Sequence, residues 1–274
     1  FHKMKSGPIP LTDIKLYIAE LSIAINELHN NNIVYCDMKP ENVMIDKNGH
    51  LKLTDFGLSC FMKPDELLKT VSGTPEFIAP EVLLGQGYGR KIDWWGIGLL
   101  TYELIFRSTP FSGMNNQYIY QSILKKDPVY PKNTDPTIIT FLSTLLQKDP
   151  SKRGGFRFIV HSEFMSGIDF QAVYDKKVLP SYIPEINGIK DTSNFDPKYT
   201  KEKARDSDSN SDNHLELDDN HLEGFSFYGT SENLKLNEFH LNYSSSKLVT
   251  SQSTIFHGED DSYLVRVNKF DESY

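Results

Sequence analysis

The stretch YCDMKPEN at residues 35–42 and the triplet Asp-Phe-Gly at residues 55–57 decide how this chain is interpreted. Between them, residues 43–45 are apolar and residues 51–54 alternate, which is typical of two short strands, and residues 46–49 supply turn formers. We therefore expect a β-hairpin that carries one acidic loop at each of its ends.

The two loops hold side chains that suit phosphoryl transfer, a reaction that needs positioning and charge neutralisation more than covalent chemistry. Asp37 can accept the proton of a hydroxyl or orient that hydroxyl, and Lys39 can neutralise charge on the phosphate. Asn42 and Asp55 offer the hard oxygen ligands that Mg²⁺ prefers. A single acidic turn is usually a solvated loop, so the joint pattern carries the argument.

With further motifs in the same order, these loops resemble the protein kinases. Residues 79–81 (APE) match the end of an activation segment, and residues 93–95 (DWW) match the start of a central helix. Arg153 stands where that family pairs an arginine with Glu81, a structural role. The resemblance implies ATP and Mg²⁺ as cofactors and Met44 as the floor under the adenine.

Three shorter motifs resemble those of the AGC group of serine/threonine kinases. They are GTPE at 73–76, PSYIP at 180–184 and DTSNFD at 191–196. The resemblance implies that Phe195 reaches over the nucleotide, that an upstream kinase phosphorylates Thr70, and that Ser226 is a second phospho-acceptor. Ser226 lies in the apolar island at residues 224–228, which by composition alone is equally a sticky patch or a docking motif.

The residues expected to contact a protein substrate are mostly acidic. The resemblance assigns this role to Glu41, Thr74, Glu76 and Glu103. Glu41 and Glu103 match positions that bind arginines upstream of the acceptor, and carboxylates form forked bonds to a guanidinium. A partly buried structural acid is the competing interpretation of Glu103. We therefore expect serine/threonine substrates with basic residues near the acceptor.

The fold class that follows is mainly α with short β-hairpins, the large (C-terminal) lobe of a protein kinase over residues 1–186, followed by a largely disordered tail. Residues 187–229 match the AGC tail, and residues 230–274 are expected to be a disordered linker or the start of a second domain. Because the chain supplies no glycine-rich phosphate loop and no strand lysine ahead of the first acidic loop, we expect the small lobe to be absent. Residues 15–35 and 50–59 most resemble the RSK-type ribosomal protein kinases.

Apolar residues at helical spacing predict a helix that begins after Pro10, is capped by Thr12 or Asp13, and ends at the asparagines of residues 30–32. Similar segments predict three further helices, at residues 92–106, 117–125 and 138–146.

The acidic charge of the chain is concentrated in one segment. Residues 206–223 hold seven acids and no Lys or Arg, and so account for −7 of the formal net charge of −8. The remainder is nearly neutral, which excludes a broad basic surface for nucleic acid, and no apolar run of ~18 residues suits a membrane span. We expect a monomer with no nucleic-acid or membrane partner, in a reducing cytoplasm or nucleus.

The two cysteines, Cys36 and Cys60, stand where the AGC resemblance implies basic residues that grip a phosphate on Thr70. Loss of both cations predicts that phosphorylation orders the loop less than in relatives. One hypothesis places the two thiols close enough for a redox-sensitive contact. The alternative, two separate small apolar substitutions, is favoured from sequence because a disulfide needs Cα atoms within about 7 Å.

Two functions stay open at this point. The leading hypothesis is an ATP-dependent serine/threonine kinase, because Asp37, Lys39, Asn42 and Asp55 are all present. The alternative is a non-catalytic protein-interaction module from a truncated kinase, since one lobe holds only half of a nucleotide site. On either hypothesis we expect the isolated chain to be inactive.

Overall fold

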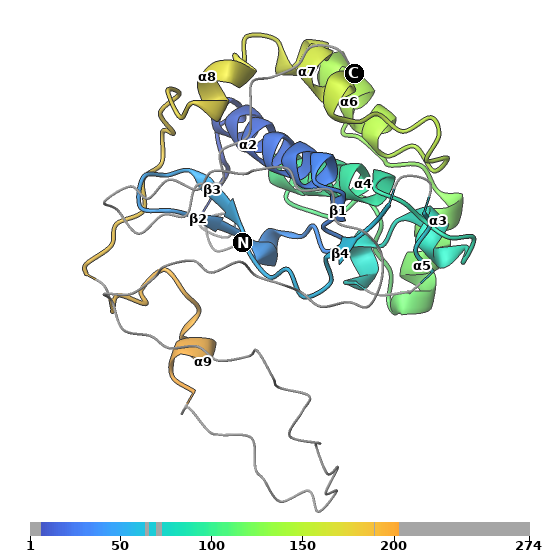
Figure 1. The fold of residues 1–274 in the computed structure, drawn as a ribbon, viewed down its shortest axis with the longest axis horizontal. Helices are drawn as coiled ribbons and strands as arrows, with labels where there is room; N and C mark the ends of the chain where they lie inside the picture. The colour runs from blue at the N-terminus through green and yellow to red at the C-terminus, as the bar shows by residue number, and fades with distance from the viewer. Residues whose placement is uncertain (1–6, 64–65, 70–72, 189, 203–274) are drawn as a thin grey trace, which may run out of the picture. The chain divides into compact units, whose positions relative to one another are not determined.

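The computed structural model describes residues 7–63, 66–69, 73–188 and 190–202 (Figure 1). This part of the chain is mainly helical and includes two sheets of two strands each. The longer helices are α2 (Leu11–Asn30), α4 (Lys91–Phe106), α5 (Asn116–Lys125) and α6 (Pro136–Leu145). The shorter ones are α3 (Pro80–Leu83), α7 (Phe156–His161), α8 (Phe170–Tyr174) and α9 (Pro197–Thr200), with 3₁₀ turns at η1 (Pro40–Asn42), η2 (Pro75–Phe77) and η3 (Glu163–Met165).

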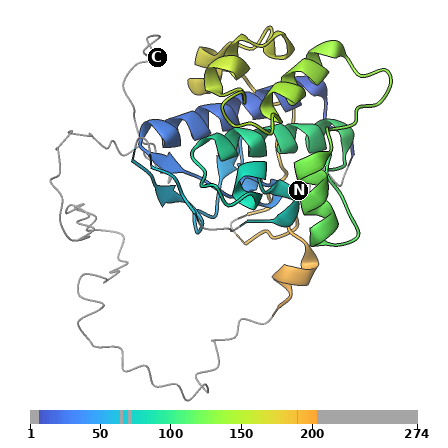
Figure 2. The same cartoon turned by 90° about the vertical axis from the view of Figure 1, so that its right-hand side faces the viewer.

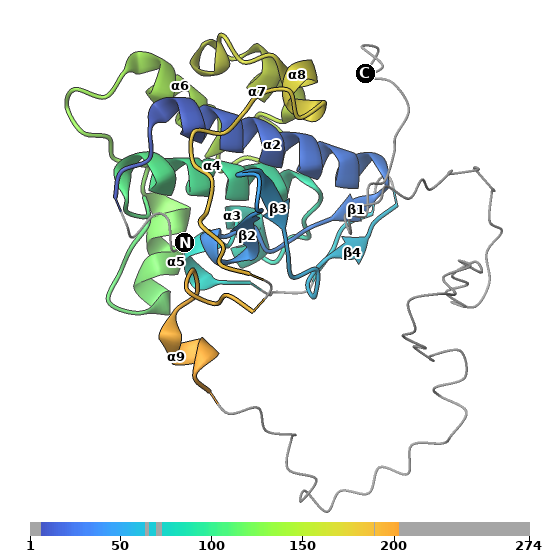
Figure 3. The same ribbon diagram turned by 90° about the vertical axis from the view of Figure 1, so that its left-hand side faces the viewer.

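Helices α2 and α4 lie side by side at the centre of this unit (Figure 1, Figure 2 and Figure 3). Helices α6, α7 and α8 lie on one side of this pair and the strands lie on the other (Figure 1). Helix α4 is surrounded, which explains why its sequence is apolar on nearly every face. The predicted helices at 92–106, 117–125 and 138–146 are confirmed to within two residues at each end.

The predicted hairpin is confirmed as β2 (Val43–Ile45) and β3 (Leu51–Leu53), antiparallel with Met44 opposite Lys52. The second sheet pairs β1 (Ile33–Val34) with β4 (Cys60–Phe61). Strand β4 was not predicted, because a two-residue strand has no readable alternation and its pairing depends on a distant partner. The β1–β4 pair holds the residues after Asp-Phe-Gly beside the start of the first acidic loop.

The predicted cap of the first helix is wrong. Pro10 is the N-cap of α2, and Asp13 lies inside the helix with only 5% of its surface exposed. Its carboxylate instead accepts a hydrogen bond from the Ser181 hydroxyl. The segment around Ser181 runs across α2 (Figure 3) and lies so close to Gly49 that a Cβ there would clash with the carbonyl of Tyr182. Asp13 thus tethers the chain that leaves the helical unit.

The segment after residue 186 was predicted to lack order, yet its first part forms local turns and α9. The Asp191 carboxylate accepts hydrogen bonds from the backbone N–H groups of Asn187, at 2.6 Å, and Ser193, at 2.9 Å. Such side-chain bonds replace backbone partners in turns, a mechanism that composition alone does not reveal. In the described ranges, no helix combines the length and apolar character needed to cross a membrane.

Gly96 lets α4 approach the first acidic loop, because a Cβ there would lie 2.6 Å from the Cβ of Met38. We expect Gly96→Ala to destabilise the fold by about 1–2 kcal/mol, since overpacking outweighs the gain in helix propensity. Thermal unfolding would measure this, with Gly89→Ala as the control because its Cβ would meet only ordinary contacts at 3.9 Å. Equal melting temperatures for the two variants would contradict the close packing.

Candidate active site

The first acidic loop connects β1 to β2 and ends in the 3₁₀ turn η1. Asp37 in this loop is 5% exposed. Its Oδ2 atom accepts hydrogen bonds from Lys39 Nζ at 2.6 Å and from Asn42 Nδ2 at 2.7 Å. The Asn42 amide also donates to the backbone carbonyl of Asp37 at 3.0 Å. One carboxylate oxygen is therefore fixed by two donors, which leaves Oδ1 to accept a further proton or hydrogen bond.

A buried carboxylate on α4 holds the loop in place from behind. Asp93, 1% exposed, accepts hydrogen bonds from the backbone N–H groups of Tyr35 at 2.9 Å and Cys36 at 2.8 Å, and its Oδ2 lies 2.7 Å from His29 Nε2. Cys36 adopts a left-handed backbone conformation with φ of 68°, an uncommon state for a residue other than glycine. The bonds to Asp93 compensate for that conformation and so fix the direction of Asp37.

This role of Asp93 was not predicted from the sequence, although a signal exists. An acid on the buried face of an apolar helix needs a partner, because buried polar groups are hydrogen bonded. For His29, likewise, the sequence predicts only a place near the end of the first helix and no contact with Asp93. Its ring packs edge-on against Trp94 with centroids 5.3 Å apart, which joins the end of α2 to α4.

Asp55 follows β3 at the open end of the β2–β3 hairpin, where β2 also begins, and has a left-handed conformation with φ of 55°. The hairpin places it near Asn42, because the backbone N–H of the preceding Thr54 donates to the Asn42 carbonyl at 2.9 Å. Tyr35 supports the same corner: its hydroxyl donates to the Thr54 carbonyl at 2.6 Å, and its ring meets that of Phe56 edge-on at 5.4 Å. The Asp55 carboxylate is exposed and accepts from the Gly57 N–H at 3.2 Å.

Asn42 and Asp55 fit a hard divalent cation. Because the Asn42 amide nitrogen is used as a donor to Asp37, its carbonyl oxygen is left as a ligand, and the exposed Asp55 carboxylate offers further oxygens. Among the described residues, His, Cys, Asp and Glu side chains form no group of three or more that could hold a metal on their own. The remaining ligands of a cation here would therefore come from water or phosphate oxygens.

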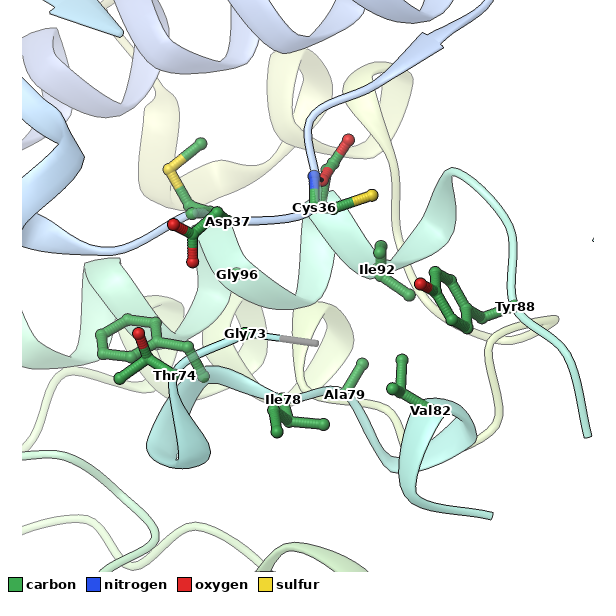
Figure 4. Close-up of a pocket in the computed structure, with 13 residues that line it drawn as sticks. Cys36, Asp37, Gly73, Thr74, Ile78, Ala79, Val82, Tyr88, Ile92 and Gly96 are labelled. Carbon is green, nitrogen blue, oxygen red and sulfur yellow. Dashed lines mark hydrogen bonds between the residues drawn. The ribbon is translucent and has the colours of Figure 1, made fainter. Parts of the chain in front are cut away.

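A pocket opens beside Asp37, between the first acidic loop and the segment that ends in Ala79 (Figure 4). Thr74 lies across this pocket from Asp37, and the hydroxyl and the carboxylate point toward each other. In the structure, however, neither Asp37 nor Lys39 is hydrogen bonded to the Thr74 side chain; the donors on Asp37 are Lys39 and Asn42. The resemblance to the protein kinases implies that Thr74 bonds Asp37 and Lys39, and the structure places Thr74 at the site without that bond.

Three carboxylates expected to meet a basic substrate influence one another. Glu103, on α4, has a buried Oε2 atom with no hydrogen-bond partner in the described structure. Burial raises the pKa of Glu103 to about 7, and the negative charges of Glu41 and Glu76 add to that rise. The described structure supplies no hydrogen bond to this buried oxygen, and two further acids add negative charge, so the ionised form of Glu103 is disfavoured. That arrangement leaves Oε2 of Glu103 available to an external cation.

The remaining predicted site residues are more scattered. Met44 is half-buried in β2, and Phe195 is 48% exposed in the segment before α9, with no described contact that joins it to Asp55. Thr70 and Ser226 lie outside the described residues. The predicted pair of Arg153 and Glu81 is confirmed, with N–O distances of 2.6 and 2.8 Å.

The site and the helical unit around it have the features of a protein kinase, and comparisons with known proteins agree. Residues 1–165 match the protein kinase domain, and residues 186–227 match the protein kinase C terminal domain. The chain belongs to the protein kinase family. The two matches together, and the relatives, identify it as an AGC-type serine/threonine kinase by family.

Similar proteins come from Saccharomyces cerevisiae, Schizosaccharomyces pombe and Dictyostelium discoideum. The chain is 39% identical to serine/threonine-protein kinase YPK2/YKR2 of Saccharomyces cerevisiae over 211 residues, and the matched region covers 76% of this chain and 31% of that protein. It is 40% identical over 210 residues to serine/threonine-protein kinase gad8 of Schizosaccharomyces pombe, covering 75% and 37%. A RAC family serine/threonine-protein kinase homolog of Dictyostelium discoideum is 36% identical over 205 residues, covering 74% and 46%. The chain thus spans less than half the length of each of these relatives.

Proposed function

We propose that this chain contributes the catalytic half of an enzyme that transfers the γ-phosphoryl group of ATP to serine or threonine hydroxyls of proteins. The observation that carries the proposal is the geometry at Asp37. One of its oxygens is fixed by Lys39 and Asn42, and the other is left toward the pocket beside Thr74. A carboxylate held in this way can orient an acceptor hydroxyl and take up its proton.

Each residue of the site has a distinct task in that reaction. Asp37 accepts the hydroxyl proton through Oδ1, and Lys39, 2.6 Å from Asp37 Oδ2, places a positive charge beside the transferred phosphate. Asn42 and Asp55 would hold Mg²⁺, which neutralises charge on the phosphate oxygens when bound. Met44 and Phe195 are the proposed contacts of the adenine. The buried bonds from Asp93 keep Asp37 in place between turnovers.

We propose that the full-length protein also supplies a glycine-rich loop over the phosphates and a strand lysine. A small lobe would complete the site. We propose in addition an RSK-type relationship, a monomeric state, a cytoplasmic or nuclear location, and Thr70 and Ser226 as phospho-acceptors of an upstream kinase. The alternative function is a non-catalytic interaction module that binds protein substrates without turnover.

The test uses the full-length protein that contains these residues. We expect it to transfer phosphate from Mg-ATP to a serine peptide with arginines upstream of the acceptor, and to stop when Mg²⁺ is chelated. A protein that binds the peptide but transfers no phosphate would establish the interaction module instead. Replacing the upstream arginines by alanine, at constant length, is the matched control for the basic context.

The proposed basic context predicts a pH dependence of peptide binding. Because the pKa of Glu103 lies at about 7, its carboxylate is largely protonated at pH 6 and ionised at pH 8. We expect the affinity for the arginine peptide to increase as the pH rises through that window, and Glu103→Gln to lower the affinity and flatten the dependence. Fluorescence anisotropy of a labelled peptide measures both. An unchanged pH profile in Glu103→Gln would show that other groups cause it.

The raised pKa of Glu103 has the opposite effect on folding stability, which decreases as the pH rises. The pKa of Glu103 in the fold exceeds its ordinary value of 4.5, so the native state binds more protons than the unfolded state between about pH 4.5 and 7. The contribution of Glu103 to folding stability is therefore greatest at acidic pH and is lost as the pH rises through that window. Binding of a guanidinium restores a partner to the ionised form, which is why ligand and proton compete at this site.

A further inference from the structure

The two cysteines of the chain lie against each other at the edge of the active site. Cys36 directly precedes Asp37, and Cys60 is the first residue of β4, three positions after Gly57. Their Sγ atoms are 3.9 Å apart, both residues are half-buried, and both thiols are free. This distance confirms the part of the redox hypothesis that places the two thiols near each other, and the redox step itself is the proposal made below.

Bonds that do not involve sulfur hold the two thiols in position. Strand pairing sets Val34 opposite Cys60, the Cys36 N–H donates to Asp93 Oδ1 at 2.8 Å, and the Ser59 hydroxyl donates to the Tyr35 carbonyl at 3.1 Å. The Cys36 thiol makes only a long contact of its own, 3.7 Å to the Val34 carbonyl. The sulfurs therefore face each other because the backbone around them is fixed, and bond formation needs a movement of about 2 Å to reach the ~2.05 Å of an S–S bond.

We propose that Cys36 and Cys60 are a modification site: they form a reversible intramolecular disulfide when the chain meets a peroxide. The Cys60 sulfur attacks one peroxide oxygen, the O–O bond breaks, and the hydroxide that leaves takes a proton to become water. The sulfur of Cys36 then attacks the sulfenic acid on Cys60, an S–S bond replaces the S–O bond, and a second water leaves. Two thiols and one hydrogen peroxide give one disulfide and two waters, and a dithiol reductant reverses the step.

The surroundings of the two thiols determine which one reacts with peroxide first and how fast the reaction is. Burial, with the charge of Asp93, raises the pKa of both thiols. Cys60 begins β4 beside Phe61, which is 65% exposed, whereas Cys36 lies against the buried Asp93, so Cys60 is the better candidate to meet peroxide first and Cys36 is the resolving thiol. Because little thiolate is present near neutral pH, the reaction is slow compared with that of dedicated peroxide sensors, and it needs sustained oxidant.

The bond would join the first acidic loop to the segment that follows Asp-Phe-Gly. It closes a loop from Cys36 to Cys60 that contains Lys39, Asn42 and Asp55, so the proposed catalytic residues lie within one covalent ring. Such a ring restricts the unfolded chain, and the oxidised form should melt at a higher temperature than the reduced form. The proposal does not rest on phosphoryl transfer, because its readout is a covalent bond.

The experiment treats the reduced 274-residue chain with hydrogen peroxide and then maps peptides without reduction. We expect the intact mass to fall by two hydrogen atoms, thiol titration of the unfolded chain to fall from two thiols to none, and a linked Cys36–Cys60 peptide that dithiothreitol abolishes. Sulfinic or sulfonic acids in place of that peptide, or disulfide-linked dimers as the main product, would overturn the proposal.

Single serine variants test the order. In Cys36→Ser, we expect a sulfenic acid at Cys60 that persists and is trapped by dimedone, because its resolving thiol is gone. In Cys60→Ser, we expect Cys36 to stay reduced at the same exposure. Both variants keep the size of the side chain, and their thermal unfolding is measured beforehand. Equal trapping at the two cysteines would contradict the assigned order, and trapping in the wild type equal to that in Cys36→Ser would contradict the resolving step.

Discussion

Asp37→Asn is expected to reduce phosphoryl transfer by the full-length protein by about 10²–10⁴-fold, the range that a positioned acid–base group supplies. The substitution keeps the shape of the side chain, and Lys39 and Asn42 can still donate to the amide oxygen Oδ1. It removes the negative charge that accepts the hydroxyl proton. The measurement is kcat on an arginine-containing serine peptide at saturating Mg-ATP.

The control for this prediction is Asp127→Asn, which removes the same charge from a side chain that is 97% exposed. We expect it to leave kcat unchanged, because its contact with Lys148 at 3.6 Å is a surface ion pair of little energetic weight. Thermal unfolding of Asp37→Asn should stay close to that of the wild type. A loss of activity that follows a loss of fold would assign Asp37 a structural role, and full activity in the folded variant would refute the proposed base.

The proposed catalytic residues could be named from the sequence because their spacing is local. Asp37, Lys39 and Asn42 fall within six residues, and a hairpin with readable alternation separates them from Asp55. Short-range patterns of this kind fix both the element and the loop that follows it. Arg153 and Glu81 are 72 positions apart, so their pairing was predicted from a family resemblance and not from spacing.

The structural features that could not be predicted depend on contacts between segments that are far apart in the sequence. The bonds that Asp93 accepts from the N–H groups of Tyr35 and Cys36 join residues that are 58 and 57 positions apart, respectively, and no periodicity in the sequence predicts them. Strand β4 exists only because β1 is there to pair with it. Asp13 was assigned to a helix cap on local grounds, but the tertiary bond to Ser181, 168 residues away, takes its carboxylate. The proximity of the two cysteines has the same long-range origin.

Arg153→Ala is expected to destabilise the fold by about 3–5 kcal/mol, because it leaves the buried Glu81 carboxylate without its partner. Arg153 is 2% exposed and uses most of its donors. Besides the two bonds to Glu81, Nη1 donates to the Lys91 carbonyl and Nε to the Gln147 carbonyl, each at 3.0 Å. Its guanidinium also lies 5.1 Å from the centre of the Trp95 ring. We expect the melting temperature to fall by roughly 6–20 °C.

Lys152→Ala is the matched control, since the neighbouring Lys152 side chain is 73% exposed and its pair with Asp149 is long, at 3.8 Å. We expect a change within about 0.5 kcal/mol for it. The double variant Glu81→Leu with Arg153→Met separates two explanations of the loss. If Arg153→Ala loses stability because the buried charge on Glu81 is left unpaired, replacing both partners by apolar groups should recover much of that stability. If the double variant is as unstable as Arg153→Ala, the bonds to the Lys91 and Gln147 carbonyls contribute most of the lost stability, and the guanidinium stabilises the start of α4 more than it neutralises Glu81.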